Sequence, residues 1–338
     1  MSDPARTVRA PVKITDVAAA AGVAPMTVSR AINTPDRVSP ETMARVRAAI
    51  DRLGYVPNLI AGGLSSRRSR MVAAIVPTIA HPMFAGMTQT FTDAMRQAGY
   101  QVMLSISGYG ETDDESVLRA LLSRRPDALL ITGVSHTPTA EQMITEAHVP
   151  VVEIWDVSER PIDMIIGFDH TEVGEAVAAF FLAKGHNRFA VISTDDPRAL
   201  TRMRGFTGAV QWADGIVVAE SVLRAPSTIS AGREALRGLL GQLSDRTALY
   251  CSSDVLAFGA ITEALQHGIK VPEQLAVCGF GNFELSAASE PSFTTVNVEG
   301  AETGRIAAGF LLQRLANRSA VGHERVKVPF RIVERAST

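Results

Sequence analysis

The sequence from residue 71 onward alternates short apolar segments with longer amphipathic ones. The apolar segments, each short enough for one strand, are 71–77, 101–106, 127–132, 150–154, 163–168, 188–193, 247–251, 275–280 and 325–334. The amphipathic segments have helical spacing and are 84–98, 112–124, 139–147, 171–184, 201–213, 229–243, 254–267 and 300–316. Alternation of this kind is typical of parallel sheets with helices on both faces. The number of strands suits two α/β lobes better than a single sheet.

The beginning of the chain has a different pattern, ITDVAAAAGVAPMTVSRAIN at residues 14–33. It predicts one helix over 14–21, stopped by Gly22, and a second from Pro25 to Ile32, where a proline at the first helical position costs no hydrogen bond. A third helix is predicted from Ser39 to Leu53. Because helices this short are not stable alone in water, we expect the three to share one small all-α core.

Charge is distributed unevenly along the chain. Residues 1–70 contain eleven Lys or Arg and five Asp or Glu, a net charge of +6. The whole chain has 33 and 35 of these residues, a net charge of −2, so the remainder carries −8. A basic end on an acidic body is the asymmetry expected of a nucleic-acid-binding head. The alternative is a solvated basic tail.

Two short helices joined by a glycine turn within a three-helix unit form the helix-turn-helix pattern, in which the second helix enters the major groove of DNA. At the exposed start of that helix, Pro25 and Met26 would touch thymine methyl groups, and Arg30 would pair with guanine O6 and N7. Side chains suited to phosphate oxygens follow at Thr27, Ser29 and Asn33. A three-helix module that binds protein is the alternative, because the motif TVSR alone is weakly specific.

Several motifs carry a family resemblance: TDVAAAAGVAPMTVSRAIN at 15–33, LGYVPN at 53–58, MRGF at 203–206 and CSSDVLAFGA at 251–260. Together with the two expected lobes, they resemble the lactose-repressor (LacI/GalR) family of transcription regulators over nearly the whole chain. One departure is Ala24, which stands where the family usually has a serine that caps the recognition helix. The resemblance implies DNA contacts from Thr15, Pro25, Met26, Thr27, Ser29, Arg30, Asn33, Arg37, Ser39, Tyr55, Asn58 and Leu64.

The resemblance also gives a role to residues 58–70. In the family this segment folds into a short hinge helix only on operator DNA, and a leucine from each subunit, matching Leu64, wedges into the minor groove. Gly62 and Gly63 cost about 2 kcal/mol of helix propensity relative to alanine, so the helix is not expected to form unaided. The alternative is a flexible tether, with Leu64 packed on the body.

The family further implies an effector site in the cleft between the lobes, which resemble periplasmic sugar-binding proteins. Ligands of such sheets bind beyond the carboxyl ends of the strands. The residues placed there are His81, Met83, Phe84, Tyr109, Thr132, His136, Asp169, Arg202, Ser253, Gly281 and Asn282. Arg202 would hold a carboxylate or hydroxyls through two hydrogen bonds, Asp169 would accept from sugar hydroxyls, and Phe84 would lie against a sugar face.

A second departure from the family suggests the chemistry of the effector. Many sugar-responsive members have an aspartate where this chain has Gly281, followed by Asn282. A missing carboxylate removes repulsion of an anion, and the loops VSHTP at 134–138 and GFGNFE at 279–284 resemble the gluconate-responsive branch. We therefore expect a sugar acid such as gluconate or a ketogluconate, free or phosphorylated, with His136 and Arg202 facing its charge. For His136, an ordinary surface-loop histidine is the alternative.

Enzymes are disfavoured by the motifs that the sequence lacks. It contains no GxGxxG, no GxxxxGK[ST] and no HExxH pattern. No base is evident beside Ser252, Ser253 or Asp254, so no catalytic residue is predicted. Asp195 and Asp196 form either a metal site or a loop turn, of which the turn is expected, and neither a metal nor a cofactor is predicted.

The cellular compartment is inferred from cysteines and apolar runs. Cys251 and Cys278 lack CxxC spacing, which argues against a disulfide framework and a structural zinc site. The sequence contains no run of 18 apolar residues, so no transmembrane helix is predicted. The N-terminus does not resemble a secretory signal. We expect a cytoplasmic protein without a membrane partner.

The sequence thus predicts a ligand-responsive DNA-binding transcription regulator, a repressor of sugar-acid uptake or catabolism genes that its effector releases from DNA. We expect a head at 12–57, a hinge and linker at 58–70, and a body at 71–338. The N-lobe is expected to comprise 71–166 and 298–325, and the C-lobe 167–297 and 326–338. A homodimer would read a pseudo-palindromic, double-stranded operator, and the ending VERAST, without leucine heptads, argues against a tetramer.

Three alternatives stay open at this point. A ligand acting as corepressor would use the same parts with the opposite sign. The target could be another sugar or nucleoside pathway. The chain could also be a sugar sensor that does not bind DNA.

Overall fold

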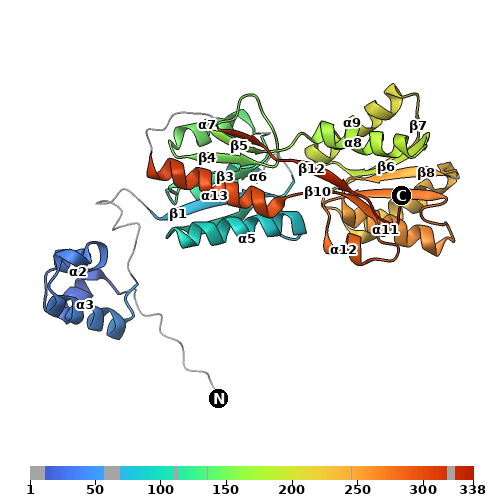
Figure 1. Ribbon diagram of the computed structural model, residues 1–338. Helices are drawn as coiled ribbons and strands as arrows, with labels where there is room; N and C mark the ends of the chain where they lie inside the picture. The colour runs from blue at the N-terminus through green and yellow to red at the C-terminus, as the bar shows by residue number, and fades with distance from the viewer. Residues whose placement is uncertain (1–11, 57–68, 110–112, 135, 245, 318–323) are drawn as a thin grey trace, which may run out of the picture. The chain divides into compact units, whose positions relative to one another are not determined.

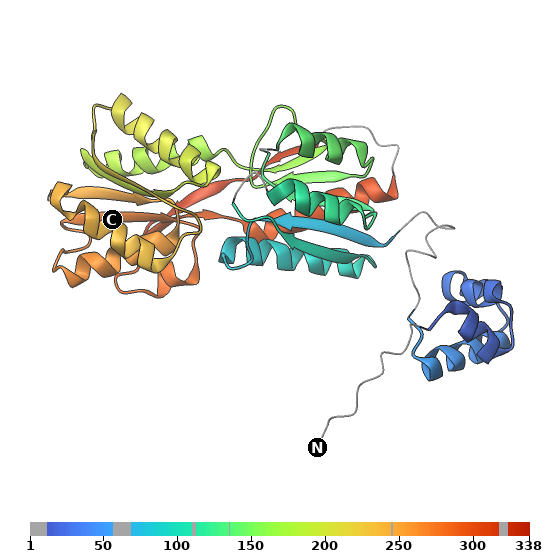
Figure 2. The same ribbon diagram turned by 180° about the vertical axis from the view of Figure 1, so that it is seen from behind.

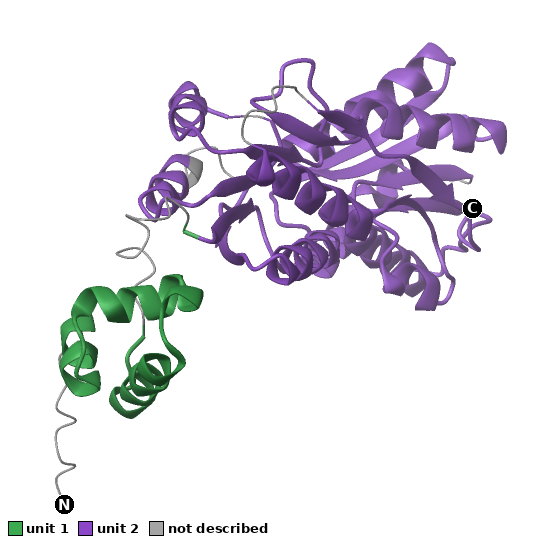
Figure 3. Cartoon of the chain, turned by 60° about the vertical axis from the view of Figure 1, so that its left-hand side comes forward, with its two compact units in different colours: residues 1–69 green, residues 70–338 purple. Residues whose placement is uncertain are grey.

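The computed structural model describes residues 12–56, 69–109, 113–134, 136–244, 246–317 and 324–338. The chain forms two compact units, residues 1–69 and 70–338 (Figure 3). We call the first the head and the second the body.

The head is a three-helix unit, as the sequence predicts. It contains α1 (Ile14–Ala21), α2 (Pro25–Asn33), the 3₁₀ turn η1 (Pro35–Arg37) and α3 (Pro40–Leu53). Each helix contributes one fully buried valine to a shared core, namely Val17, Val28 and Val46. Small alanines beside these valines let the helices approach closely. The helices are therefore stabilised by packing against one another, since none is long enough to be stable alone.

The ends of the three helices follow the sequence signals. Gly22 adopts the left-handed conformation, with a φ of 65°, that ends α1 and turns the chain. Ser39 Oγ accepts a hydrogen bond from the backbone N–H of Thr42 at the start of α3. Ala24 precedes α2 in the extended conformation of a cap residue but supplies no side-chain hydrogen bond. The α2 start thus lacks the side-chain cap of the α3 start, although the Thr27 and Val28 N–H groups donate to the Ala24 carbonyl oxygen.

The body contains two six-stranded sheets (Figure 1). The first has the order β11-β5-β4-β3-β1-β2 and is parallel throughout. Its strands are β1 (Met71–Val76), β2 (Gln101–Ile106), β3 (Ala128–Thr132), β4 (Val151–Ile154), β5 (Met164–Gly167) and β11 (Arg325–Lys327).

The second sheet has the order β12-β10-β9-β8-β6-β7. It is parallel except for the antiparallel pair of β10 and β12. Its strands are β6 (Arg188–Thr194), β7 (Ile216–Leu223), β8 (Thr247–Cys251), β9 (Leu275–Phe280), β10 (Thr294–Val298) and β12 (Phe330–Val333).

Helices cover both faces of each sheet. The strands carry apolar side chains on both faces, so both faces have to be buried. In β1, Val72, Ala74 and Val76 pack in the core cluster of α5 (Pro82–Gln97) and α13 (Gly300–Ala316). Ala73 and Ile75 belong to the core cluster of α6 (Asp113–Leu122) and α7 (Pro138–Glu146). These two helices cover the other face of the sheet (Figure 2). The second sheet lies in the same way between two helix pairs, α8 (His170–Ala183) with α9 (Pro197–Trp212), and α10 (Ile229–Leu239) with α11 (Asp254–Gln266). The predicted α/β fold with two lobes is confirmed.

The segment 325–334, predicted as one strand, is two strands in different sheets. β11 pairs with β5 in the first lobe, and β12 pairs with β10 in the second. The described chain passes between the lobes three times: after β5, after β10 and after β11. A sequence pattern gives the length of an apolar run but not the sheet to which each half belongs, so this division was not predictable.

The sequence analysis also missed β7, β10 and the short helix α12 (Glu284–Ala288). β10 has the sequence TTVNV, yet all five residues are buried. Its polar side chains are hydrogen-bonded: Thr295 Oγ1 donates to Asp254 Oδ1, and Asn297 Nδ2 donates to Glu299 Oε1 at 2.7 Å. Because its buried polar groups are hydrogen-bonded, this strand can contain polar residues, and its sequence therefore shows no apolar run.

Replacing Ala24 with serine is expected to stabilise α2, because residue 24 already has cap geometry and a serine Oγ would accept from an unpaired N–H. The expected gain is about 1 kcal/mol, measured as roughly fivefold slower hydrogen exchange of the α2 amides in the full chain. Ala20→Ser, at an exposed position inside α1, is the control and should give no gain. Unchanged or faster exchange in Ala24→Ser would contradict the assignment of residue 24 as a deficient cap.

Candidate functional site

The exposed face of α2 presents side chains that are not used by the head itself. Pro25, Met26 and Arg30 are exposed, and Met26 keeps 63% of its surface accessible. An exposed methionine beside an arginine is the combination that reads thymine methyl groups and guanine edges. Among the described residues, Arg30 forms no ion pair that would hold its guanidinium away from a partner.

Other residues of the predicted DNA surface have structural roles as well. Thr27 and Ser29 are half-buried, and Asn33 Nδ2 donates to the Ser29 carbonyl oxygen at 3.0 Å. Thr15, Arg37 and Ser39 are exposed, and Tyr55 packs on the head core. Asn58 and Leu64 lie outside the described residues.

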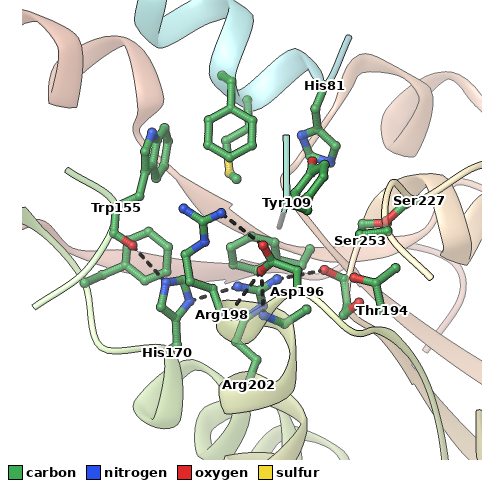
Figure 4. Close-up of a pocket in the computed structure, with 17 residues that line it drawn as sticks. His81, Tyr109, Trp155, His170, Thr194, Asp196, Arg198, Arg202, Ser227 and Ser253 are labelled. Carbon is green, nitrogen blue, oxygen red and sulfur yellow. Dashed lines mark hydrogen bonds and ion pairs between the residues drawn. The ribbon is translucent and has the colours of Figure 1, made fainter. Parts of the chain in front are cut away.

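A pocket in the body lies between the two lobes (Figure 4). We call it pocket 1. Its lining follows the carboxyl ends of strands from both sheets: His81, Met83, Phe84, Tyr109, Trp155, Phe168, His170, Thr194, Asp196, Arg198, Ala199, Arg202, Ala225, Ser227, Ser252, Ser253 and Phe280. Parallel strands of each sheet all end at one edge, which is why residues so far apart in sequence meet here.

A second pocket, pocket 2, adjoins the first and shares Tyr109, His170, Asp196 and Arg198 with it. Its further lining is Pro77, Ser107, Gly108, Thr132, Gly133, Val134, Asp156, Val157, Asp169, Thr171, Pro197 and Thr201. The cavity volumes are about 350 Å³ for pocket 2 and about 40 Å³ for pocket 1. Pocket 1 therefore has room for only a few water molecules, and a larger ligand needs both pockets or a movement of the lobes.

A chain of hydrogen bonds beneath pocket 1 joins the lobes. Arg202 Nη1 donates to His170 Nδ1 at 2.8 Å, and Nη2 donates to the Ser252 carbonyl oxygen at 3.1 Å. Arginine can only donate, so His170 accepts through Nδ1 and carries its proton on Nε2. That proton is donated to the Trp155 carbonyl oxygen in the first lobe, at 2.8 Å. The guanidinium also stacks over the Phe280 ring, 4.0 Å from its centroid.

Arg198 lies differently from Arg202. It extends from the first turn of α9, and its Nη2 donates to Asp196 Oδ2 at 3.0 Å. Its guanidinium lies 5.7 Å from the centroid of the Phe84 ring in the other lobe. Figure 4 shows this guanidinium beside Asp196 in the middle of the pocket.

The charged groups of pocket 1 favour an anion. Burial, together with the nearby Arg202, lowers the pKa of His81 to about 4, and the same causes hold the pKa of His170 well below its usual value. Both histidines are therefore neutral near pH 7. This leaves two guanidinium groups, of Arg198 and Arg202, against the single carboxylate of Asp196. Burial alone would raise the pKa of Asp196, but the Arg198 and Arg202 guanidinium groups and the Ala199 N–H together outweigh burial and lower it.

Several buried polar atoms around pocket 1 have no hydrogen-bond partner within the described part of the protein. They are His81 Nδ1, Trp155 Nε1, Arg202 Nε and Ser252 Oγ. An unsatisfied buried polar atom costs roughly 1–3 kcal/mol. Four of them around one cavity indicate a site built for a polar ligand.

Most predicted effector residues line one of the two pockets. His81, Met83, Phe84, Tyr109, Arg202 and Ser253 line pocket 1, and Tyr109, Thr132 and Asp169 line pocket 2. Asp169 Oδ1 also caps α8 by accepting from the Thr171 N–H at 2.8 Å. The two terminal nitrogens of Arg202 already donate to groups within the protein. In this arrangement Arg202 cannot make the predicted pair of hydrogen bonds to a ligand.

His136 and Asn282, predicted at the effector site, lie outside both pocket linings. His136 Nε2 is 3.0 Å from Glu153 Oε1, and both side chains are almost fully buried. A carboxylate buried in β4 needs a partner, and His136 supplies it. Asn282 turns toward the end of the chain, where its Oδ1 accepts from Arg335 Nη2 at 2.7 Å.

Gly281 has a backbone reason that the sequence could not reveal. Its φ is 128°, and a Cβ placed on it would lie 2.5 Å from the Phe283 ring. A glycine is therefore required by the turn, and the absence of an aspartate there is not by itself a sign of ligand charge.

Sequence reasoning missed several pocket residues, of which Asp196, Arg198 and His170 matter most. Asp196 belongs to the pair read as a turn or a metal site. It caps α9, because Oδ1 accepts from the backbone N–H groups of Arg198 and Ala199. An aspartate followed by proline at a helix start, with an arginine two residues later, was the available signal. In the described part of the chain, no cluster of three or more His, Cys, Asp or Glu is suited to a metal ion.

The described residues include no helix long and apolar enough to span a bilayer.

Comparison with known protein families finds two matches, one in the head and one in the body. The family model "Bacterial regulatory proteins, lacI family" matches residues 13–58, and "Periplasmic binding protein-like domain" matches residues 178–338.

Two relatives carry the name HTH-type transcriptional regulator GntR. The Escherichia coli K12 protein is 32% identical over 305 residues, covering 90% of this chain and 92% of its own. The Pseudomonas aeruginosa protein is 33% identical over 327 residues, covering 96% and 95%. A crystal structure of a LacI family transcriptional regulator from Silicibacter pomeroyi is similar with a TM-score of 0.90 and 32% identity, covering 97% of this chain and 99% of that chain.

A helix-turn-helix head joined to a two-lobed body with a polar pocket defines the class of DNA-binding regulators that respond to a small molecule. Regulators of this class are not enzymes. The chain belongs to the lacI family of bacterial regulatory proteins. Members of this family bind operator DNA and small-molecule effectors and function as dimers.

Replacing Arg30 with alanine is expected to cost roughly 1–3 kcal/mol of DNA-binding free energy at one base-pair position and to relax the preference there. Competition binding with duplexes that differ from a selected site by single base pairs would measure this. Arg52→Ala, which removes an exposed arginine from α3, should leave the base preference unchanged. If Arg30→Ala discriminates among the duplexes as the parent does, Arg30 does not read a base.

The body is expected to lose stability as the pH falls from about 6.5 to about 4. The folded pKa of His81 is about 4, below the ordinary value of 6.5, so the unfolded chain binds the proton more readily. Stability contributed by neutral His81 is complete above pH 6.5 and is lost toward pH 4, by about 3 kcal/mol at most. His81→Gln should therefore flatten the dependence of Tm on pH in part, because His170 titrates in the same direction.

His148→Asn, which replaces an exposed histidine, serves as the control and should keep the slope of the parent. An equal slope in the parent and in His81→Gln would show that His81 is not held neutral by the pocket.

Proposed function

We propose that this protein represses genes for the uptake or catabolism of a sugar acid, gluconate or a ketogluconate. In this proposal it acts in the cytoplasm as a homodimer on a pseudo-palindromic operator. The head at 12–57 reads DNA through the exposed face of α2. The hinge and linker at 58–70 carry Leu64 to the minor groove, and the body at 71–338 binds the effector.

The observation that carries the proposed effector is the set of unpartnered polar atoms in a cationic cavity. Arg202 Nε can only donate, and Trp155 Nε1 can only donate. Ser252 Oγ can donate or accept, and His81 Nδ1 can do either according to its tautomer. A carboxylate satisfies the donors, and adjacent hydroxyls satisfy the rest. Two guanidinium groups against one carboxylate favour a monoanion over a neutral sugar.

The other end of a sugar acid suits pocket 2. Asp169 and Asp156 line it together with Thr132 and Tyr109. Carboxylates accept from sugar hydroxyls, and the phenol and the threonine hydroxyl can donate as well as accept. The cavity of about 350 Å³ supplies the room that pocket 1 lacks. The likeness to the two GntR regulators supports the same class of effector.

The proposed dimer is supported by the family and by exposed apolar side chains of the body. The edge strand β2 exposes Leu104 and Ile106, by 41% and 52%. A shallow groove between α11 and α12 is lined by Phe258, Leu265 and Leu285, with smaller residues beside them. Apolar patches of this kind on a soluble body are typical of interfaces. Two copies would present two heads to the two halves of an operator.

The regulatory mechanism is a coupled equilibrium between effector and operator binding. A ligand that hydrogen-bonds Arg202 Nε acts on the chain through His170 to Trp155, which links the lobes. A ligand can shift the arrangement of the lobes only by the difference in its affinity for the two arrangements. We propose that the effector favours the arrangement with weaker operator binding.

Fluorescence anisotropy with a selected duplex, at several salt concentrations and with sugar acids added, tests this proposal. Operator affinity should fall steeply with salt, because lysine and arginine contacts release counterions. Gluconate, 2-ketogluconate or 6-phosphogluconate should weaken binding by roughly 5- to 150-fold, the usual range of allosteric coupling. The same compound should raise the Tm of the body, and glucose should do neither.

Strengthened DNA binding by a sugar acid would reverse the sign and make the ligand a corepressor. Binding of DNA with no response of operator affinity or Tm to any of the three acids would refute the proposed effector class. Equal affinity for all duplexes would refute the proposed operator reading.

A further inference from the structure

Arg198 lies where the two pockets adjoin and where the two lobes meet. It lines both pockets. Its guanidinium lies 5.7 Å from the Phe84 ring centroid, and a Cβ placed on Gly133 would lie 3.7 Å from its Nη1. Phe84 lies in the first turn of α5 and Gly133 follows β3, so an arginine of the second lobe lies against two elements of the first. A ligand spanning both pockets must pass this side chain.

The hydrogen bonding of Arg198 leaves its guanidinium available. Within the described part of the chain, the guanidinium donates one hydrogen bond to a side chain, from Nη2 to Asp196 Oδ2 at 3.0 Å. Arg202, by contrast, is fixed by His170, by Ser252 and by stacking on Phe280. Arg202 can offer only Nε without breaking the chain that joins the lobes. Arg198 can offer two parallel N–H groups to a carboxylate, the geometry that binds anions most strongly.

Asp196 behaves as a built-in carboxylate for Arg198. Its Oδ1 is held by the backbone N–H groups of Arg198 and Ala199, at 3.1 and 3.0 Å, which fixes the carboxylate at the start of α9. Its Oδ2 receives the guanidinium. Because the carboxylate is held by backbone and the arginine by side-chain torsions alone, the arginine is the partner that can move.

We propose that Arg198 selects an acid over a neutral polyol by exchanging the carboxylate of Asp196 for the carboxylate of the effector. This inference rests on the proposed sugar-acid function and names the residue that reads the charge. Arg202 keeps two separate roles in this scheme, because it fixes the tautomer of His170 and offers only its Nε to the ligand. The other charged groups of the pockets, Asp156 and Asp169, repel an anion and face its hydroxyl end instead.

The two members of the pair should respond to substitution with opposite signs. Arg198→Gln removes the charge that binds the acid. Its affinity for gluconate should fall about 10- to 100-fold, as for loss of a charge-assisted hydrogen bond, with little change for uncharged gluconamide. Asp196→Asn keeps a good helix cap but removes the competing charge, so its affinity for gluconate should rise, by about threefold or more.

Isothermal titration of the full chain with gluconate and gluconamide measures both effects. The parent should prefer the acid by about tenfold or more, and Arg198→Gln should show no preference. Arg198→Lys keeps the charge without the planar fork and should retain a weaker preference. Arg204→Gln, on the same helix but exposed and outside both linings, is the matched control and should bind as the parent does. Circular dichroism verifies that each variant is folded.

The outcomes separate this inference from the proposed function. Acid preference retained in Arg198→Gln, or weaker acid binding in Asp196→Asn, overturns the role of Arg198 while the sugar-acid function stands. A parent that binds neither gluconate nor another sugar acid removes both. If Arg198→Gln does not fold, the opposite shifts of Asp196→Asn and Arg198→Lys decide the question.

Discussion

The arrangement of the two lobes of the body depends on a buried guanidinium. Arg202 is enclosed by the second lobe, and because it can only donate, it dictates which nitrogen of His170 carries the proton. That proton is then committed to the Trp155 carbonyl oxygen in the first lobe. A buried charge is stable only when its hydrogen bonds are satisfied. The buried Tyr250 hydroxyl lies near the Arg202 guanidinium and interacts with it, but Arg202 Nε has no hydrogen bond of good geometry within the described residues. The same residue thus supports the link between the lobes and presents an unfilled donor to a ligand.

The DNA-reading surface and the effector pocket share no residue. The exposed face of α2 is complete within the head, whereas both pockets are lined by residues 77–280. An effector therefore does not alter the side chains that would read base pairs. In the proposed mechanism, its influence on DNA binding acts through the arrangement of the lobes. This separation is why coupling, rather than competition, is the appropriate description.

The sequence predicts the parts of this protein that depend on local pattern. The three helices of the head follow from Gly22, Pro25 and the pair Ser39-Pro40, and the parallel sheets follow from the alternation of strands and helices. What it does not predict depends on distant contacts. β10 was not detected because its buried threonines and asparagine are hydrogen-bonded to residues elsewhere in the chain, namely Thr338, Asp254 and Asn282.

The effector pocket shows the same division between local and distant information. Most of the residues predicted after strand ends do line the two pockets, since the carboxyl edge of a parallel sheet brings them together. His136 lies outside both pocket linings because its partner, Glu153, belongs to the buried strand β4. The sequence named Arg202 and not Arg198, because only the folded pocket reveals which guanidinium is already hydrogen-bonded within the protein.

The three passages of the chain between the lobes have a consequence for synthesis. Each lobe is assembled from separated stretches of polypeptide, and residues 325–333 add an edge strand first to one sheet and then to the other. A ribosome must therefore translate residues 325–333 before either lobe can be finished, whereas α3, the last described helix of the head, ends at Leu53. During elongation the nascent molecule would already possess its DNA-reading helices while lacking the pocket that is proposed to regulate them.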